Sequence, residues 1–118
     1  MTVSISEYVE RAGPLEITEI EFQDPILALA GEGWALTALC PWRVLRGDAL
    51  ELSWSSPDAE DRAWDLIGRQ VVAADQRGRD AALRLSDGSV IELFSDTDTD
   101  PWVLRLPGFT FVGPLAAG

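Results

Sequence analysis

Residues 81–94 constrain the fold most, because they carry the pattern of a β-hairpin that turns at Asp87-Gly88. Aspartate and glycine both tolerate the positive φ of a tight turn, and an alternating apolar run lies on each side. A three-residue loop ending in glycine pairs Leu83 with Ile91 and gathers the large apolar side chains on one face. A two-residue loop would place Glu92 opposite Leu83, so we predict the three-residue loop.

The composition indicates one globular domain, residues 1–118, in the cytoplasm. Of the 118 residues, 47% are hydrophobic and five are tryptophan, which is enough apolar material for a core. No apolar run approaches the length of a membrane span, and the first residues lack the pattern of a signal peptide. The single Cys40 cannot form an internal disulfide, which fits a reducing compartment.

The charge narrows the classes of partner. The net charge is −11, and all nine basic residues are arginine. Binding to nucleic acid or to an anionic membrane depends on basic side chains, so we expect neither. A basic protein partner and a cation remain open, because an acidic surface attracts both, and so does the interpretation that the charge serves solubility alone.

Alternating patterns predict a mainly β fold, either a β-sandwich or a partly open barrel, with one central helix and with α+β as the alternative. Strands are expected at residues 16–22, 43–45, 49–54, 69–74, 102–106 and 109–112, besides hairpins at 26–39 and 81–94. In the first hairpin, a four-residue loop at 30–33 would pair Leu29 with Trp34. In the strand at 49–54, the residues Leu50, Leu52 and Trp54 are expected to alternate inward.

Two segments have helical signals. Ser4 and Glu7 have the spacing of a capping box, which predicts a short helix to about residue 11. Residues 55–60 offer serine caps, a proline for the first turn and acids near the positive end of the helix dipole. We therefore predict a helix at 57–67, with Ala59, Ala63 and either Leu66 or Ile67 facing the core and a C-terminal glycine cap.

The two halves of the chain resemble each other and suggest an internal repeat, 15–54 and 69–113, joined by the helix at 57–67. The hairpin glycines, Gly33 and Gly88, lie 55 residues apart, and the Pro-Trp pairs that end in Trp42 and Trp102 lie 60 apart. Alternating strands with glycine turns can also look alike by chance. A true repeat predicts two β-units that pack face to face or close into a barrel-like sheet.

This layout resembles an uncharacterised family of small bacterial duplicated-β domains. The resemblance is carried by the hairpin 83–88, the acidic residues 96–100, the strand 102–104 and the pair Pro107-Gly108. Some proteins of this general type are immunity and orphan proteins of bacterial toxin systems. The resemblance implies a binding role and no catalytic residue, and the corner at 40–42 matches the family's aromatic corner only approximately.

The missing residue types exclude most catalytic chemistry. The chain has no histidine and no lysine, so it has no Ser-His-Asp or Cys-His system, no Schiff base and no phosphate-loop lysine. One cysteine cannot build a thiolate metal cage. We therefore expect a protein that is not an enzyme and that uses no cofactor.

The loop at 95–100 is the sharpest local feature, because its aspartates alternate. Asp96, Asp98 and Asp100 would place three carboxylates on one side of an extended loop, which suits a hard cation such as calcium. The EF-hand pattern is not met. The alternative is a solvated acidic loop that keeps a sheet edge from pairing.

The helix offers the other candidate site. Trp64 is a candidate for an exposed tryptophan, and tryptophan dominates the hot spots of protein interfaces. Glu60, Asp61 and Asp65 add negative charge around it; such residues ordinarily form a solvated helix face, and the alternative is that this face meets a basic partner. The predicted function is a non-enzymatic, possibly immunity-like interaction module for a basic protein, with homodimerisation or a small-ligand or cation site at 95–100 as alternatives.

Overall fold

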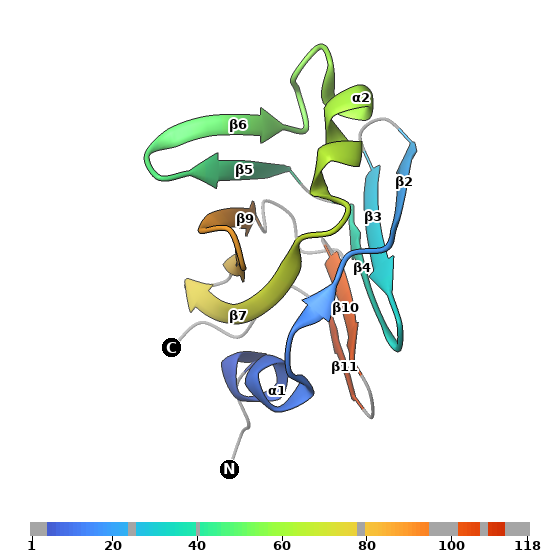
Figure 1. The fold of residues 1–118 in the computed structure, drawn as a ribbon, viewed down its shortest axis with the longest axis vertical. Helices are drawn as coiled ribbons and strands as arrows, with labels where there is room; N and C mark the ends of the chain where they lie inside the picture. Colours follow the sequence, from blue (N-terminus) through green and yellow to red (C-terminus); the bar gives the residue numbers. More distant parts are fainter. Residues whose placement is uncertain are drawn as a thin grey trace.

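The computed structural model describes residues 5–23, 26–39, 41–77, 80–94, 102–106 and 109–112. In these residues eleven strands form two antiparallel sheets, which stack face to face as a sandwich (Figure 1). The mainly β fold predicted from the sequence is therefore confirmed. Between the two alternatives within it, the described strands form open sheets and do not close into a barrel.

We call the six-stranded sheet A and the five-stranded sheet B. Sheet A has the order β1 (Leu15–Glu16), β7 (Gln70–Arg77), β8 (Asp80–Leu85), β9 (Ser89–Leu93), β5 (Trp42–Arg46) and β6 (Ala49–Ser53). Sheet B has the order β11 (Phe109–Val112), β10 (Trp102–Leu106), β4 (Trp34–Ala38), β3 (Ile26–Gly31) and β2 (Glu19–Gln23). The helical segments are α1 (Ile5–Ala12), α2 (Ala59–Ala63) and the short 3₁₀ turn η1 (Trp64–Leu66).

The two halves of the chain exchange hairpins between the sheets. Strands β2, β3 and β4 form a meander in sheet B, and the next hairpin, β5–β6, joins sheet A beside β9. Strands β7, β8 and β9 repeat this order in sheet A, and the next hairpin, β10–β11, joins sheet B beside β4. Trp42 pairs with Leu93 at the first crossing, and Trp102 pairs with Ala38 at the second. The predicted units thus share one strand order, while their duplication stays a prediction.

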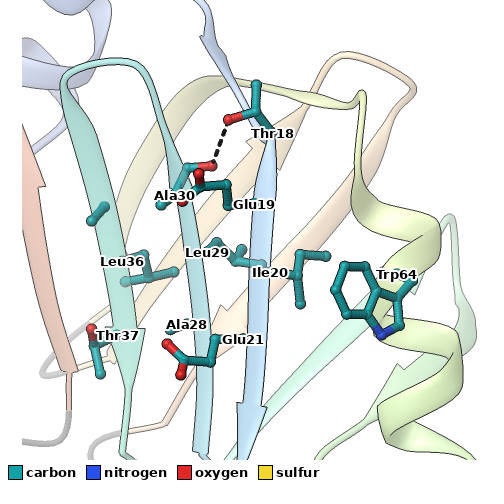
Figure 2. Close-up of a pocket in the computed structure, with 11 residues that line it drawn as sticks. Thr18, Glu19, Ile20, Glu21, Ala28, Leu29, Ala30, Leu36, Thr37 and Trp64 are labelled. Carbon is teal, nitrogen blue, oxygen red and sulfur yellow. Dashed lines mark hydrogen bonds between the residues drawn. The ribbon is translucent and has the colours of Figure 1, made fainter.

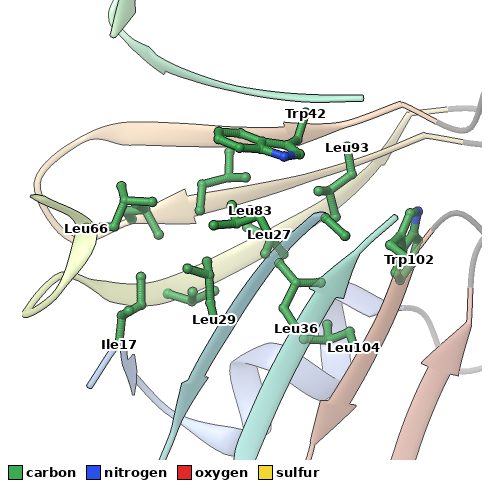
Figure 3. Packing of buried hydrophobic residues seen from close by; sticks show 14 of the residues in the cluster. Ile17, Leu27, Leu29, Leu36, Trp42, Leu66, Leu83, Leu93, Trp102 and Leu104 are labelled. Carbon is green, nitrogen blue, oxygen red and sulfur yellow. The ribbon is translucent and has the colours of Figure 1, made fainter. Parts of the chain in front are cut away.

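The core lies between the two sheets and is made of side chains that alternate along the strands (Figure 3). Leu27 and Leu29 of β3 face Leu83 of sheet A's β8, and all three are fully buried. The two crossing tryptophans are also fully buried, and each large apolar side chain of this kind contributes about 1.5–3 kcal/mol on burial. Helix α1 packs against β7 and β10 and covers one end of the sandwich.

The hairpin at residues 81–94 has the predicted register. Leu83 pairs with Ile91, and Ala81 pairs with Leu93. Gly88 has a φ of 90° and its N–H donates to the carbonyl of Leu85 at 3.0 Å, as a glycine-ended loop requires. The three-residue loop is therefore confirmed.

The register predicted for the first hairpin is wrong by two residues. Leu29 pairs with Leu36, and Gly31 pairs with Trp34, so the loop has two residues and not four. The reason is a close approach at Gly31, where the Trp34 indole crosses the backbone and donates its Nε1–H to the carbonyl of Glu16 at 3.0 Å. A shift of two residues leaves the same side chains inward, so the apolar pattern cannot distinguish the two registers.

The inward alternation predicted for residues 50–54 is wrong at two of its three positions. Val44 pairs with Leu52, but Leu45 pairs with Leu50, which leaves Glu51 in a β-bulge. The bulge moves Leu50 to the outer face, where it is 58% exposed, and only Leu52 is buried. Trp54 follows the end of β6 and is 41% exposed.

The central helix is shorter than the predicted 57–67. It begins at Ala59, because Ser56 instead closes a turn after β6, where its Oγ accepts the N–H of Ser53 at 3.0 Å. It continues only through η1, and Ile67 is already extended with a ψ of 133°. Ala59, Ala63 and Leu66 are buried as predicted. At the N-terminal end, α1 confirms the short helix, although Ser4 of its capping box lies outside the described residues.

We expect Gly31→Ala to destabilise the protein by about 3 kcal/mol, because overpacking at a backbone contact is costly. An added Cβ would lie 2.0 Å from the carbonyl oxygen of Glu16 and 2.3 Å from Nε1 of Trp34. Urea denaturation followed by tryptophan fluorescence measures the loss. Gly47→Ala is the control, since it has a φ of 63° but no atom within 4 Å of its Cβ and should lose only about 1 kcal/mol. Equal losses in the two variants would contradict the steric explanation.

Candidate protein-binding surface

The outer face of sheet B carries an open groove of about 520 Å³ (Figure 2). Strands β3 and β4 alternate leucines, which point into the core, with small residues, which point outward. The outward residues Ala28, Ala30, Ala35 and Thr37 are half-buried and form the floor of the groove. Because these side chains are short, the floor lies below the longer side chains on either side.

Glutamates from β2 form one side of the groove. Glu19 pairs across the sheet with Ala30, and Glu21 pairs with Ala28. Both carboxylates are exposed, whereas Ile20 between them is buried. Figure 2 shows the two glutamates beside these alanines, with Trp64 on the far side of β2. The groove therefore has an apolar floor, an acidic side and a tryptophan near its edge.

The structure brings one of the sequence-predicted residues into this groove. Trp64 lines it and is 53% exposed, as expected for an interface tryptophan. Asp61 and Asp65 are exposed on the same helical segment but do not line the groove. Nothing is described for the side chain of Glu60, although its backbone lies in α2.

The sequence reasoning missed the glutamates and the small floor. The sequence did contain a signal for this groove. Glu19 and Glu21 alternate with inward residues, and small residues alternate with leucines on the next two strands. The sequence pattern does not show that these strands pair in one sheet or that this sheet lies beside Trp64.

The predicted metal site lies outside the described residues, since Asp96, Asp98 and Asp100 all fall in 95–101. Elsewhere, in the part of the chain that the structure describes, no group of three or more His, Cys, Asp or Glu side chains is placed to hold a metal ion. None of the helices described here has the length and apolar character needed to cross a bilayer.

A network of charged side chains joins the two hairpin ends of sheet A. Arg69 donates to both oxygens of Glu51, with its Nη2 at 2.7 Å from Oε2 and its Nη1 at 3.2 Å from Oε1. Its Nε lies 3.2 Å from Oδ2 of Asp87, and Arg46 reaches the same oxygen at 2.9 Å. Ser89 donates to the other oxygen of Asp87. Since these residues come from β5, β6, the β8–β9 loop, the start of β9 and the segment after η1, the network ties separate parts of the chain together.

This environment shifts the pKa values of the network. The hydrogen bond from Arg69 lowers the pKa of Glu51 against the opposing effect of burial, and the same bond raises the pKa of Arg69. Burial alone would raise the pKa of Asp87, but hydrogen bonds from Ser89 and the charges of Arg69 and Arg46 outweigh it, so this pKa is lowered. Each charge is thus satisfied by a partner within the network, which is typical of a structural ion cluster rather than of a reactive group.

A second hollow, of about 410 Å³, lies on the outer face of sheet A beside Trp54 and Leu50. Arg43 lines it, pairs with Glu92, and places its guanidinium 5.2 Å from the ring centre of Phe94. This hollow is lined by one cation, Arg43, and one carboxylate, Asp48, besides apolar and serine side chains, whereas the described residues that line the groove on sheet B include two glutamates and no cation.

No protein-family model, curated protein or solved structure matches this chain. The function is therefore inferred from the geometry and charge of the groove.

We expect the ion network to make stability fall in acid. The lowered pKa values of Glu51 and Asp87 contribute stability that is fully present above their unfolded values, about 4.3 and 3.9, and is lost as the pH falls through the folded values. At pH 7 the Glu51→Gln variant should be less stable than the native chain by about 1.5–3 kcal/mol, and this difference should shrink below a pH of about 4. Urea denaturation at a series of pH values measures both effects.

The control is Asp58→Asn, which removes a half-exposed carboxylate 3.9 Å from Arg62. A surface pair of this kind contributes less than about 0.5 kcal/mol. A Glu51→Gln difference that stays constant from neutral to acid pH would contradict the linkage to the Glu51 carboxylate.

Proposed function

We propose that the protein is a non-enzymatic interaction module that binds a basic protein through the groove on sheet B and the adjoining Trp64. The observation that supports this proposal most directly is the coincidence of an exposed tryptophan with two exposed glutamates around one apolar floor. Tryptophan supplies a large contact area at low entropic cost, and the carboxylates attract a complementary charge.

The charge of the whole chain adds to this local pattern. A net charge of −11 creates a negative field around the molecule, which speeds encounter with a basic partner and repels an acidic one. Asp61 and Asp65 are exposed beside Trp64 and extend the acidic surface beyond the groove. Binding of this kind weakens as salt increases, because the Debye length falls to about 3 Å at 1 M salt.

The resemblance to immunity proteins of bacterial toxin systems suggests the class of partner. A toxin with a basic surface would be neutralised by tight binding alone, which requires no catalytic residue from this chain. The absence of histidine and lysine from the sequence is compatible with such a role.

We expect the tagged protein to capture a basic protein from lysate of its native host at low salt and to release it at high salt. Trp64→Ala should weaken the affinity at least about tenfold, because a hot-spot tryptophan contributes about 2 kcal/mol or more. The capture is read by mass spectrometry and the affinity by calorimetry with the purified partner.

Trp54→Ala provides the matched control, since Trp54 is similarly exposed but lies beside the hollow on sheet A. It should leave the affinity within about twofold of the native value, because a contact outside the interface contributes almost nothing. Loss of the partner in the Trp54 variant but not in the Trp64 variant would place the interface on the other sheet. Recovery of the tagged protein alone would count against the interaction itself.

A further inference from the structure

The shape of the groove identifies the kind of segment that it holds. Its floor is two strands wide, and the outward residues on either side belong to β2 and β10. These outer strands are three strand spacings apart, which is about 14 Å. An α-helix with its side chains is about 10–12 Å wide, so a helix fits between them.

The groove is also long enough for more than two helical turns. A smaller hollow of about 190 Å³ continues it along β3, and both hollows are lined by Glu21, Ala28 and Thr37. The outward residues of β3 in the two hollows are Ala30, Ala28 and Ile26, which together span about 14 Å along the strand. This length corresponds to about nine residues of an α-helix.

A helix suits a sheet face better than an extended strand does. The backbone groups of sheet B's β3 and β4 are already paired with strands on both sides, so the face offers side chains and not hydrogen-bonding backbone. An extended segment lying on this face would leave its own N–H and C=O groups without partners, whereas a helix satisfies them internally. The small floor residues allow the helix to approach closely.

The charged side chains on the two sides of the groove determine which flank of such a helix would face which side. On the β2 side the rows end in Glu19 and Glu21 at the edge of the sheet, whereas on the β10 side the row of Ala30 and Ala35 continues to Arg105, which is exposed, before it reaches β11. A helix with lysine or arginine along one flank of its apolar stripe would place those cations against the glutamates. The opposite flank would meet Arg105 and would therefore carry acidic or neutral residues.

We propose that the occupant of the groove is an amphipathic helix of the partner, with an apolar stripe on the floor and a basic flank against Glu19 and Glu21. This inference rests on the proposed function, because it specifies which segment of a basic partner the groove would bind. It goes further by naming a helix on the face of sheet B, and not a strand added to its edge, as the bound segment.

The probe is a synthetic peptide of about 18 residues, long enough to be helical alone, with leucines at helical spacing and lysines on one flank. A second peptide has the same composition but alternates leucine and lysine, which favours a strand. Methyl spectra of the alanine-labelled full-length protein should show shifts at Ala28, Ala30 and Ala35 with the helical peptide. The affinity should fall at least tenfold in the double variant Ala28→Gln/Ala30→Gln, which fills the floor without adding charge.

Matched variants separate shape from charge. Ala73→Gln makes one such substitution on the outer face of sheet A, next to Arg84 in the pairing of β7 and β8, and should leave binding unchanged. Glu19→Gln/Glu21→Gln should weaken binding severalfold and flatten its salt dependence. Glu10→Gln/Asp48→Asn removes the same charge at exposed positions on α1 and in the β5–β6 turn of sheet A, and should have less effect.

The outcomes also separate this inference from the proposed function. Tighter binding of the alternating peptide, with shifts in the amides of β2, would overturn the helix and indicate strand addition. No alanine shift with either peptide at millimolar concentration would also overturn it. If the lysate partner is lost by Trp64→Ala but retained by Ala28→Gln/Ala30→Gln, the interaction stands and the groove is not its site.

Discussion

The structure depends on the burial of the apolar face of each sheet against the other. Each sheet also contains one hairpin from the opposite half of the chain, β5–β6 in sheet A and β10–β11 in sheet B. The chain enters sheet A at Trp42 and returns to sheet B at Trp102, and both indoles are fully buried at these crossings. The Phe22 ring meets Trp42 edge-on across the core, with ring centres 6.4 Å apart. Without either crossing, one sheet would lack a two-stranded hairpin and the core would lack a buried tryptophan. The packing of the core and the exchange of hairpins therefore stabilise the same structure.

The outward side chains of the two sheets can differ in chemistry, because the core is formed by the inward side chains alone. Sheet A carries ion pairs outward, Arg43 with Glu92 and Arg84 with Asp75, and the larger network around Arg69 closes one end of it. Sheet B instead carries small side chains with glutamates along one side. This difference gives the molecule one face whose charges are largely neutralised by neighbours and one face with an acidic groove, and we assign binding to the second.

Much of the fold could be predicted because alternation with a period of two is a strong signal. The hairpin at 81–94 was predicted to the residue, since a shift of one position would have buried Glu92 with the leucines. The first hairpin was not, because a shift of two positions keeps the same face inward, and only the contact of Trp34 with Gly31 decides it. The bulge at Glu51 was also missed, because the alternating pattern continues through it and the side chain bonds to a partner distant in sequence, Arg69.

The candidate site was predicted only in its most local part. An exposed Trp64 follows from the helical spacing of Ala59, Ala63 and Leu66, which leaves the tryptophan off the buried side. Its position near Glu19 and Glu21 follows from the strand order and could not be read from neighbouring residues. The small floor residues were overlooked because alternation is usually examined for the side that faces the core.

The hairpin exchange has a consequence for how the protein is made. Strand β4 gains its second neighbour only from β10, which lies more than sixty residues further along the chain. During synthesis the edge of β4 therefore presents unpaired backbone donors and acceptors until residues 102–106 have left the ribosome. An open edge of this kind invites pairing with another nascent chain, and contacts this distant in sequence form slowly. Expression at reduced temperature and low synthesis rate is thus favoured by the topology itself.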